Sequence, residues 1–143
     1  MSETQPKHSL SGILEAAVYV DDLAGAEAFY GEVLGLEKIG QRDGRHVFFR
    51  CGQTMVLVFR AAETVKAVPA GGLPIPAHGA TGAGHLCFAL VGTMLDGWRQ
   101  RLEDAGVMIE ADFRWPNGAR SIYFRDPGGN SIELAEPKLW ARA

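Results

Sequence analysis

The stretch SIYFRDPGGNSIELAEP, residues 121–137, decides how the rest of the chain is interpreted. Residues 121–125 combine aromatic and β-branched side chains over a short span, and this pattern predicts a strand. Residues 126–130 predict a tight turn, because proline fixes φ while both glycines and the asparagine tolerate positive φ. Residues 131–135 predict a second strand, so the whole stretch is expected to form a β-hairpin.

The second strand of this hairpin carries a single carboxylate. Ile132 and Leu134 point to one face of a strand, so Glu133 between them points to the other. A carboxylate in that position faces either solvent or a polar cavity. A carboxylate that faces a cavity would need polar partner side chains from elsewhere in the chain.

Composition describes an ordinary globular chain of 143 residues, 47% hydrophobic and 22% charged, long enough for one domain. The net charge of −3 offers no electrostatic case for nucleic acid or an anionic membrane. No apolar run approaches the roughly 18 residues of a membrane span, and the N-terminus has no apolar signal region, so a cytoplasmic location is expected. Cys51 and Cys87 are interpreted as two reduced core thiols.

Working outward, both halves of the chain predict the same order of elements, β-α-β-β-β. In the first half, Asp21-Asp22 offers an N-cap for a helix and Gly35 a C-cap. In the second half, Thr93 and Gly106 take the corresponding places. The predicted strands are 13–20, 36–42, 45–51, 54–60, 85–91, 107–115, 121–125 and 131–135, and the predicted helices are 23–34 and 94–105.

This repetition indicates an internal duplication with a period of about 70 residues. It pairs Glu15 with His85 and residues 48–50 with 123–125, and it sets Glu133 opposite Leu57 or Val58. The predicted fold is α+β, with two βαβββ modules forming a curved mixed β-sheet around a cleft. The modules span about 12–60 and 84–136, and a proline- and glycine-rich linker, 61–83, joins them.

Three polar residues stand at related places in this scheme. Glu15 interrupts the first strand, His85 opens the fifth, and Glu133 interrupts the eighth. If the modules pack about a pseudo-twofold axis, these strands converge. Carboxylates brought so close need a counter-charge, which a divalent metal ion supplies. Glu15, His85 and Glu133 are therefore the candidate metal ligands.

The chain resembles the vicinal oxygen chelate superfamily, which comprises glyoxalases, bleomycin resistance proteins and extradiol dioxygenases. The resemblance rests on VDDLAGAEAFYGEVLGL (20–36), GHLCFAL (84–90) and YFRDPGGNSIEL (123–134). It implies metal ligands on strands one, four, five and eight. Glu15, His85 and Glu133 then take the first, third and fourth of these places, and Glu133 is the candidate catalytic residue.

Two departures from the family pattern stand out. Glu15 occupies a place that is usually histidine or glutamine, and strand four offers Leu57 or Val58 where a glutamate is usual. Lactoylglutathione lyases of this superfamily use all four ligands, so the resemblance does not by itself imply that activity.

The resemblance implies a divalent metal, of which Mn²⁺, Fe²⁺, Mg²⁺, Ni²⁺, Co²⁺ and Zn²⁺ suit such ligands. Three protein ligands leave room for a small substrate with adjacent oxygens, as in a lyase, isomerase or dioxygenase. The alternative is a non-catalytic protein of the bleomycin-resistance type that sequesters a drug or metabolite. A third class, an interaction domain without a ligand, predicts no cavity.

Further residues are expected around the substrate. His46 and His78 are rival ligands, interpreted as exposed or substrate-facing. The linker 61–83 is either a lid or a plain crossover. The resemblance also implies a homodimer. The candidate substrate-binding residues are Phe48, Arg50, Arg114, Trp115, Arg120 and Tyr123.

Overall fold

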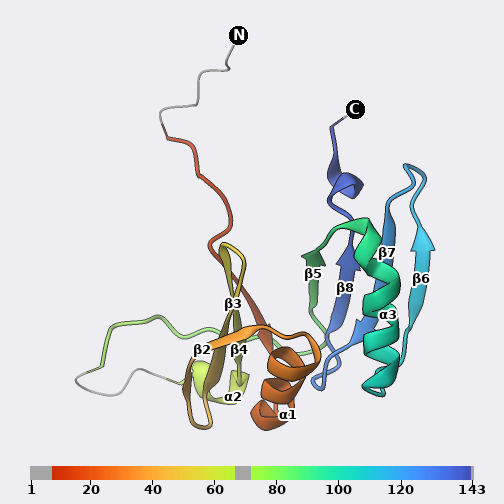
Figure 1. Cartoon of the computed structure of the whole chain (residues 1–143). Helices are drawn as coiled ribbons and strands as arrows, with labels where there is room; N and C mark the ends of the chain where they lie inside the picture. The colour runs from red at the N-terminus through yellow and green to blue at the C-terminus, as the bar shows by residue number, and fades with distance from the viewer. Residues whose placement is uncertain (1–7, 67–71, 143) are drawn as a thin grey trace.

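The computed structural model describes residues 8–66 and 72–142, and within them the strands form two four-stranded mixed sheets (Figure 1). The strands are β1 (Glu15–Tyr19), β2 (Glu37–Arg42), β3 (His46–Cys51), β4 (Thr54–Phe59), β5 (His85–Ala89), β6 (Ala111–Arg114), β7 (Arg120–Arg125) and β8 (Ser131–Ala135). The helices are α1 (Leu23–Ala28), the π-helical turn η1 (Phe29–Val33), α2 (Ala61–Thr64), the 3₁₀ turn η2 (Gly92–Met94), α3 (Leu95–Asp104) and the 3₁₀ turn η3 (Pro137–Trp140).

The two sheets have the same topology, which confirms the α+β class and the paired βαβββ modules. Their strand orders are β1-β4-β3-β2 and β5-β8-β7-β6. In each sheet the first strand pairs in parallel with the fourth, and the remaining neighbours are antiparallel. Residues 1–7 and 67–71, which include part of the predicted linker, lie outside the described residues.

The strand register settles which residue of the first module corresponds to Glu133. Leu57 pairs with Ala17 and Phe48, just as Glu133 pairs with Cys87 and Tyr123. Leu57, and not Val58, is therefore the counterpart of Glu133.

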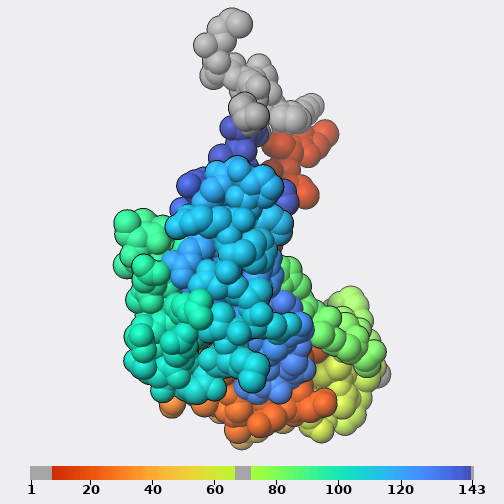
Figure 2. All heavy atoms as spheres, turned by 90° about the vertical axis from the view of Figure 1, so that its right-hand side faces the viewer, coloured from red at the N-terminus to blue at the C-terminus, as the bar shows by residue number. Residues whose placement is uncertain are grey.

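One hydrophobic core lies between the helix-covered faces of both sheets. Side chains of α1, η1 and α3 pack there with alternate residues of the central strands, among them Val58, Phe124 and Ile132, which are fully buried. Figure 1 shows α3 lying across the second sheet, and Figure 2 shows α3 and β6 side by side with the α1 segment beneath them. The opposite faces of the sheets, which carry Leu57 and Glu133, are left outside this core.

The turn 126–130 joins the modules through a buried polar cluster. Of the residues that tolerate positive φ in this turn, only Gly129 adopts it (82°). Asn130 is buried instead, and its side chain donates to the carbonyl of Tyr19 (2.9 Å) and to Asp126 (2.9 Å). Its side-chain oxygen accepts from the backbone of Gly84 (2.8 Å), which ties this turn to both β1 and the start of β5.

Several local predictions need correction. The predicted helix 23–34 is α-helical only to Ala28, although Asp22 caps it as expected by accepting from Gly25 (3.0 Å). Thr93 does not cap a helix, because it lies inside η2 and Met94 precedes α3 without a side-chain cap. The linker begins with α2, and only 111–114 of the predicted strand 107–115 is paired. No helix among the described residues is long and apolar enough to cross a membrane.

Candidate active site

Glu133 lies at the centre of the open face of the second sheet. Its strand neighbours Ile132 and Leu134 are buried in the core, which places the carboxylate on the opposite side. β5 and β7 flank it on both sides, so Glu133 is only 4% exposed. Of the two environments considered for this carboxylate, the buried one is therefore correct.

Each oxygen of this carboxylate has its own partner. Ser121 Oγ donates to Glu133 Oε2 over 2.6 Å, and His85 Nε2 lies 3.3 Å from Oε1. The other nitrogen of His85, Nδ1, lies 3.0 Å from the carbonyl oxygen of Ser131. A carbonyl only accepts hydrogen bonds, so Nδ1 carries a hydrogen and donates it.

This tautomer bears on whether a metal ion fits. With Nδ1 protonated, a neutral His85 directs the lone pair of Nε2 toward a carboxylate oxygen, which also has only lone pairs. Two acceptor atoms only 3.3 Å apart need a positive charge to hold them together. Either a second proton on the His85 ring or a cation bound by both atoms supplies it. The pair therefore fits a divalent ion as two of its ligands.

The third predicted ligand does not join them within one chain. Glu15 is exposed at the start of β1, in the other sheet. Among residues 8–66 and 72–142, no group of three or more His, Cys, Asp or Glu side chains could hold a metal ion. The expected convergence of Glu15, His85 and Glu133 inside a single chain is thus not observed, because β1 and β5 belong to separate sheets.

The carboxylate acts on two further side chains of the same face. Burial, together with the charge of Glu133, raises the pKa of Cys87 to about 12. Burial and the same charge also raise the pKa of Tyr123 to about 12. Both groups are protonated near neutral pH, so Cys87 is a thiol and not a reactive thiolate. Cys87 is also exposed, which corrects its interpretation as a core residue.

A pocket of about 670 Å³ opens over these groups. This volume lies in the range of pockets that hold small organic ligands. Phe113 stacks against Tyr123 with ring centroids 5.8 Å apart and contacts Trp115 edge-on at 4.9 Å, which gives one wall an aromatic character. The pocket is lined by His85, Cys87, Trp115, Pro116, Asn117, Tyr123, Glu133, Leu139 and Trp140.

Two of the predicted substrate-binding residues, Trp115 and Tyr123, line this pocket. Trp140 also lines it, although this residue is 85% exposed. Phe48 and Arg50 lie on the corresponding face of the first sheet, where Phe48 stacks on His46 at 4.0 Å and Arg50 is exposed.

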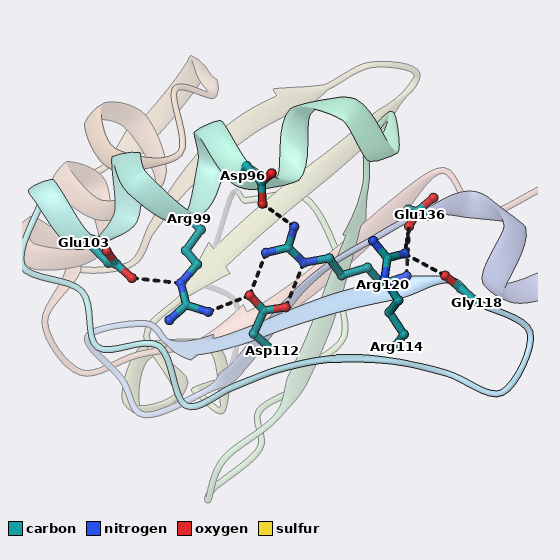
Figure 3. A network of polar contacts seen from close by, with 8 residues as sticks. All are labelled: Asp96, Arg99, Glu103, Asp112, Arg114, Gly118, Arg120 and Glu136. Atoms are coloured by element: carbon teal, nitrogen blue, oxygen red, sulfur yellow. Dashed lines mark hydrogen bonds and ion pairs between the residues drawn. The ribbon is translucent and has the colours of Figure 1, made fainter.

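The predicted arginines of the second module are held elsewhere. Arg120 donates to Asp112 (2.7 and 2.8 Å) and Asp96 (2.6 Å) beneath α3, on the helix side of the sheet (Figure 3). Arg114 donates to the carbonyl of Gly118 (2.9 Å), as the same figure shows. Neither arginine lines the pocket, and their contacts are those of structural residues.

The rival histidines lie in the first module and in the linker. His46 Nδ1 lies 2.7 Å from Arg45, and burial with the charges of Arg45 and Arg42 lowers the pKa of His46. His78 Nδ1 lies 2.7 Å from the hydroxyl of Tyr19, so this part of the linker rests on β1. No linker residue that the structure describes lines the pocket over Glu133 in the same chain.

Sequence reasoning missed Ser121 and Cys87 as members of the site. Strand alternation was a usable signal for both, because it places Ser121 on the same face as Tyr123, and Cys87 on the same face as His85. What the sequence could not show is the short hydrogen bond from Ser121 to Glu133, since that depends on the diagonal offset between β7 and β8.

The comparisons with known proteins agree with this architecture. The model of the Glyoxalase/Bleomycin resistance protein/Dioxygenase superfamily matches residues 12–134. The chain belongs to this superfamily, also called the vicinal oxygen chelate superfamily.

Among solved structures, the chain is similar to a lactoylglutathione lyase from Agrobacterium tumefaciens. The identity is 46%, the match covers 94% of this chain and 100% of that one, and the TM-score is 0.87. A putative glyoxalase family protein from Bacillus anthracis (21% identity, 92% and 98% covered, TM-score 0.69) shares the fold. An integron cassette protein from the Halifax Harbour sewage outfall metagenome also shares the fold (24% identity, 89% of this chain and 99% of that chain covered, TM-score 0.71). No curated protein sequence matches the chain.

Proposed function

We propose that the protein is a metal-dependent enzyme of the glyoxalase type, which isomerises or cleaves a small substrate bearing adjacent oxygens. The observation that carries this proposal is the buried Glu133 carboxylate, 3.3 Å from His85 Nε2 at the base of a pocket. The 46% identity to a protein titled lactoylglutathione lyase supports a lyase or isomerase over a dioxygenase. Because Leu57 takes the place of a usual glutamate ligand, we propose only the type of reaction, and we do not propose lactoylglutathione as the substrate.

We further propose that the working unit is a homodimer. The open faces of both sheets lie outside the core, and among residues 8–66 and 72–142 of the same chain no third ligand joins His85 and Glu133. A second copy that sets its first sheet against the second sheet would cover both faces and bring its Glu15 to the pair. The site would then hold one histidine and two carboxylates, which suits Mn²⁺, Fe²⁺, Mg²⁺, Ni²⁺, Co²⁺ or Zn²⁺.

A divalent ion held by His85 and Glu133 would supply Lewis-acid polarisation to the adjacent oxygens of the substrate. Glu133 would take the proton from the hydroxyl-bearing carbon next to the carbonyl and return it to the former carbonyl carbon, while the hydroxyl proton would pass to the former carbonyl oxygen. Trp115 and Tyr123 pack on the apolar part of the substrate. The side chain of Arg50 has no hydrogen bond or ion pair to the rest of the described chain, and it is the predicted arginine left to bind a carboxylate of the substrate.

Metal analysis and light scattering test the proposal directly. Protein purified without chelator is expected to be a dimer that carries about one divalent ion per site. In D₂O, the metal-loaded dimer should exchange the carbon-bound hydrogen of an α-hydroxyketone, and Glu133→Gln should not. A monomer that retains no metal and catalyses no exchange would contradict the proposal.

The sequestering alternative has one observation in its favour, the aromatic wall formed by Phe113, Trp115 and Tyr123. Such a wall binds a planar compound without a metal ion. Titration with catechols and α-hydroxyketones separates the two functions, since a sequestering protein binds equally tightly with and without metal.

A further inference from the structure

A hydrogen-bonded relay runs from Trp115 through Ser121 to the carboxylate of Glu133. The indole Nε1 of Trp115 donates to Ser121 Oγ over 2.8 Å, and Ser121 Oγ lies 2.6 Å from Glu133 Oε2. Ser121 is fully buried between them. The two bonds are therefore shielded from competing water.

The direction of this relay is fixed by chemistry. The indole N–H can only donate, and an ionised carboxylate can only accept. The hydroxyl of Ser121 accepts from Trp115, so its one hydrogen is free for Glu133. Trp115 thereby excludes the rotamers in which the Ser121 hydrogen would point to another acceptor.

The relay also decides which oxygen of Glu133 is presented to the pocket. Oε2 is held by Ser121, and Oε1 is the oxygen 3.3 Å from His85 Nε2. We propose that Trp115 and Ser121 are positioning residues that fix the Glu133 carboxylate with Oε1 directed at a bound divalent ion. This inference rests on the proposed function, and it assigns Trp115 a hydrogen-bonding role beside its contact with substrate.

The position of Trp115 is itself secured by the C-terminal segment. The Trp115 carbonyl accepts from Gly118 (2.8 Å), and its N–H donates to the carbonyl of Ala119 (2.8 Å), which closes the turn 115–119. Asn117, at the tip of that turn, donates to the carbonyls of Lys138 and Leu139 in η3 (3.0 and 3.2 Å). The relay is thus a chain of fixed contacts from η3 to Glu133.

Affinity for Co²⁺, followed by its absorption, tests the proposal in the full-length dimer. Ser121→Ala removes the donor to Oε2, and we expect about 10- to 100-fold weaker binding, the usual effect of losing a partner behind a ligand. Trp115→Phe keeps the aromatic packing and removes one hydrogen bond, so we expect about 2- to 10-fold weaker binding. Trp98→Phe is the matched control, since Trp98 packs against the core from α3 and does not line this pocket, and it should leave the affinity unchanged.

A double-mutant cycle distinguishes positioning from general damage to the pocket. If Trp115 acts through Ser121, adding Trp115→Phe to Ser121→Ala has no further effect on Co²⁺ affinity. Independent losses that multiply in the double variant would overturn the relay. Unchanged affinity in Ser121→Ala would also overturn it, while leaving the proposed function intact.

The relay can be read without any metal, which separates its failure from that of the proposed function. In the apo protein, the indole N–H signal of Trp115 in a ¹⁵N-correlated NMR spectrum reports the hydrogen bond to Ser121. Ser121→Ala and Glu133→Gln should both shift this signal, and Trp98→Phe, on α3 outside the pocket, should not. A Trp115 signal indifferent to both changes contradicts the relay, even if the wild type binds metal.

Discussion

The two modules share one backbone plan and differ at one position on it. Leu57 in β4 and Glu133 in β8 occupy equivalent places in the register, and both are buried, at 8% and 4% exposure. The backbone therefore determines that this position is enclosed, and the side chain determines whether it can do chemistry. Only the second module adds the hydroxyl of Ser121 that a buried carboxylate requires, at the place where the first module has His46.

The modules also attach their helices differently. η1 packs through Phe29 and Tyr30, which are buried in the core beside Phe124. α3 adds to its apolar contacts a network of ion pairs with β6 and β7, seen in Figure 3. One module is thus held mainly by aromatic packing, and the other is in addition sensitive to charge.

The largest expected effect comes from substituting Glu133 and comparing it with the same experiment at its counterpart Leu57. Glu133→Gln should weaken binding of the divalent ion more than about 100-fold, because one of the few proposed ligands is lost, while the isosteric amide preserves the fold. Leu57→Ala should keep the metal and lower the free energy of unfolding by about 2 kcal/mol. Mass-spectrometric metal analysis and urea denaturation measure the two effects. Equal metal loss in both variants would mean that the two faces are chemically interchangeable.

Much of the fold could be predicted because its signals are local. Alternation in residues 121–125 and 131–135, and the glycines after each helix, act over a few residues and were interpreted correctly. The π-helical turn 29–33 was not predictable in the same way. An α-helix and a π-helical turn have a similar spacing of apolar residues. The tertiary packing of Phe29 and Tyr30 selects the π-helical form here.

The site was predictable only in part, because its geometry depends on contacts between strands. Duplication correctly aligned Glu15 with His85, but alignment within a repeat does not bring two residues together in space. The structure joins His85 to Glu133 and leaves Glu15 on the other sheet. Arg120 shows the same limit, since its place next to Ser121 gave no sign that Asp112 and Asp96 would hold its guanidinium.

The ionic attachment of the second module predicts a dependence of stability on pH. Hydrogen bonds from Arg120, supported by Arg99, hold the pKa of Asp112 at about 2. The folded pKa lies below the ordinary value, so this stabilisation is present above about pH 4 and is lost as the pH falls through about 2. Asp112→Asn should lower the free energy of unfolding by about 2 kcal/mol at pH 7, and the difference should shrink toward pH 2.

Urea denaturation of both proteins between pH 7 and pH 3 measures this effect. Glu27→Gln is the control in the first module, because the Glu27–Lys38 pair (2.6 Å) is solvent-exposed and contributes less than about 1 kcal/mol. A deficit in Asp112→Asn that stays constant down to pH 3 would show that the network acts through packing and not through charge.

A smaller effect is expected where the two modules meet. Tyr30 donates to Asp126 Oδ2 over 2.7 Å, and both groups are buried. Tyr30→Phe removes this bond, while Asp126 keeps its donors Gly128 and Asn130. We expect a loss of about 1.5 kcal/mol, the lower end for a hydrogen bond to a charged group. Tyr19→Phe, which breaks a half-buried bond between β1 and His78 of the linker, should lose less, and thermal unfolding of the two variants compares them.

The smallest effects should be the same in both modules, because they depend on the backbone alone. Gly52 and Gly129 close equivalent hairpins at φ of 57° and 82°, and a Cβ at either would meet no atom within 4 Å. Alanine at each should therefore cost about 1 kcal/mol through the left-handed conformation only. Gly97 in the exposed first turn of α3 has equally open space and lacks positive φ, so Gly97→Ala should stabilise by up to about 1 kcal/mol. Urea denaturation of the three variants should give two equal losses and one gain. Unequal losses at Gly52 and Gly129 would show that the cost depends on the turn around each glycine, which has two residues in one hairpin and five in the other, and not on the left-handed conformation alone.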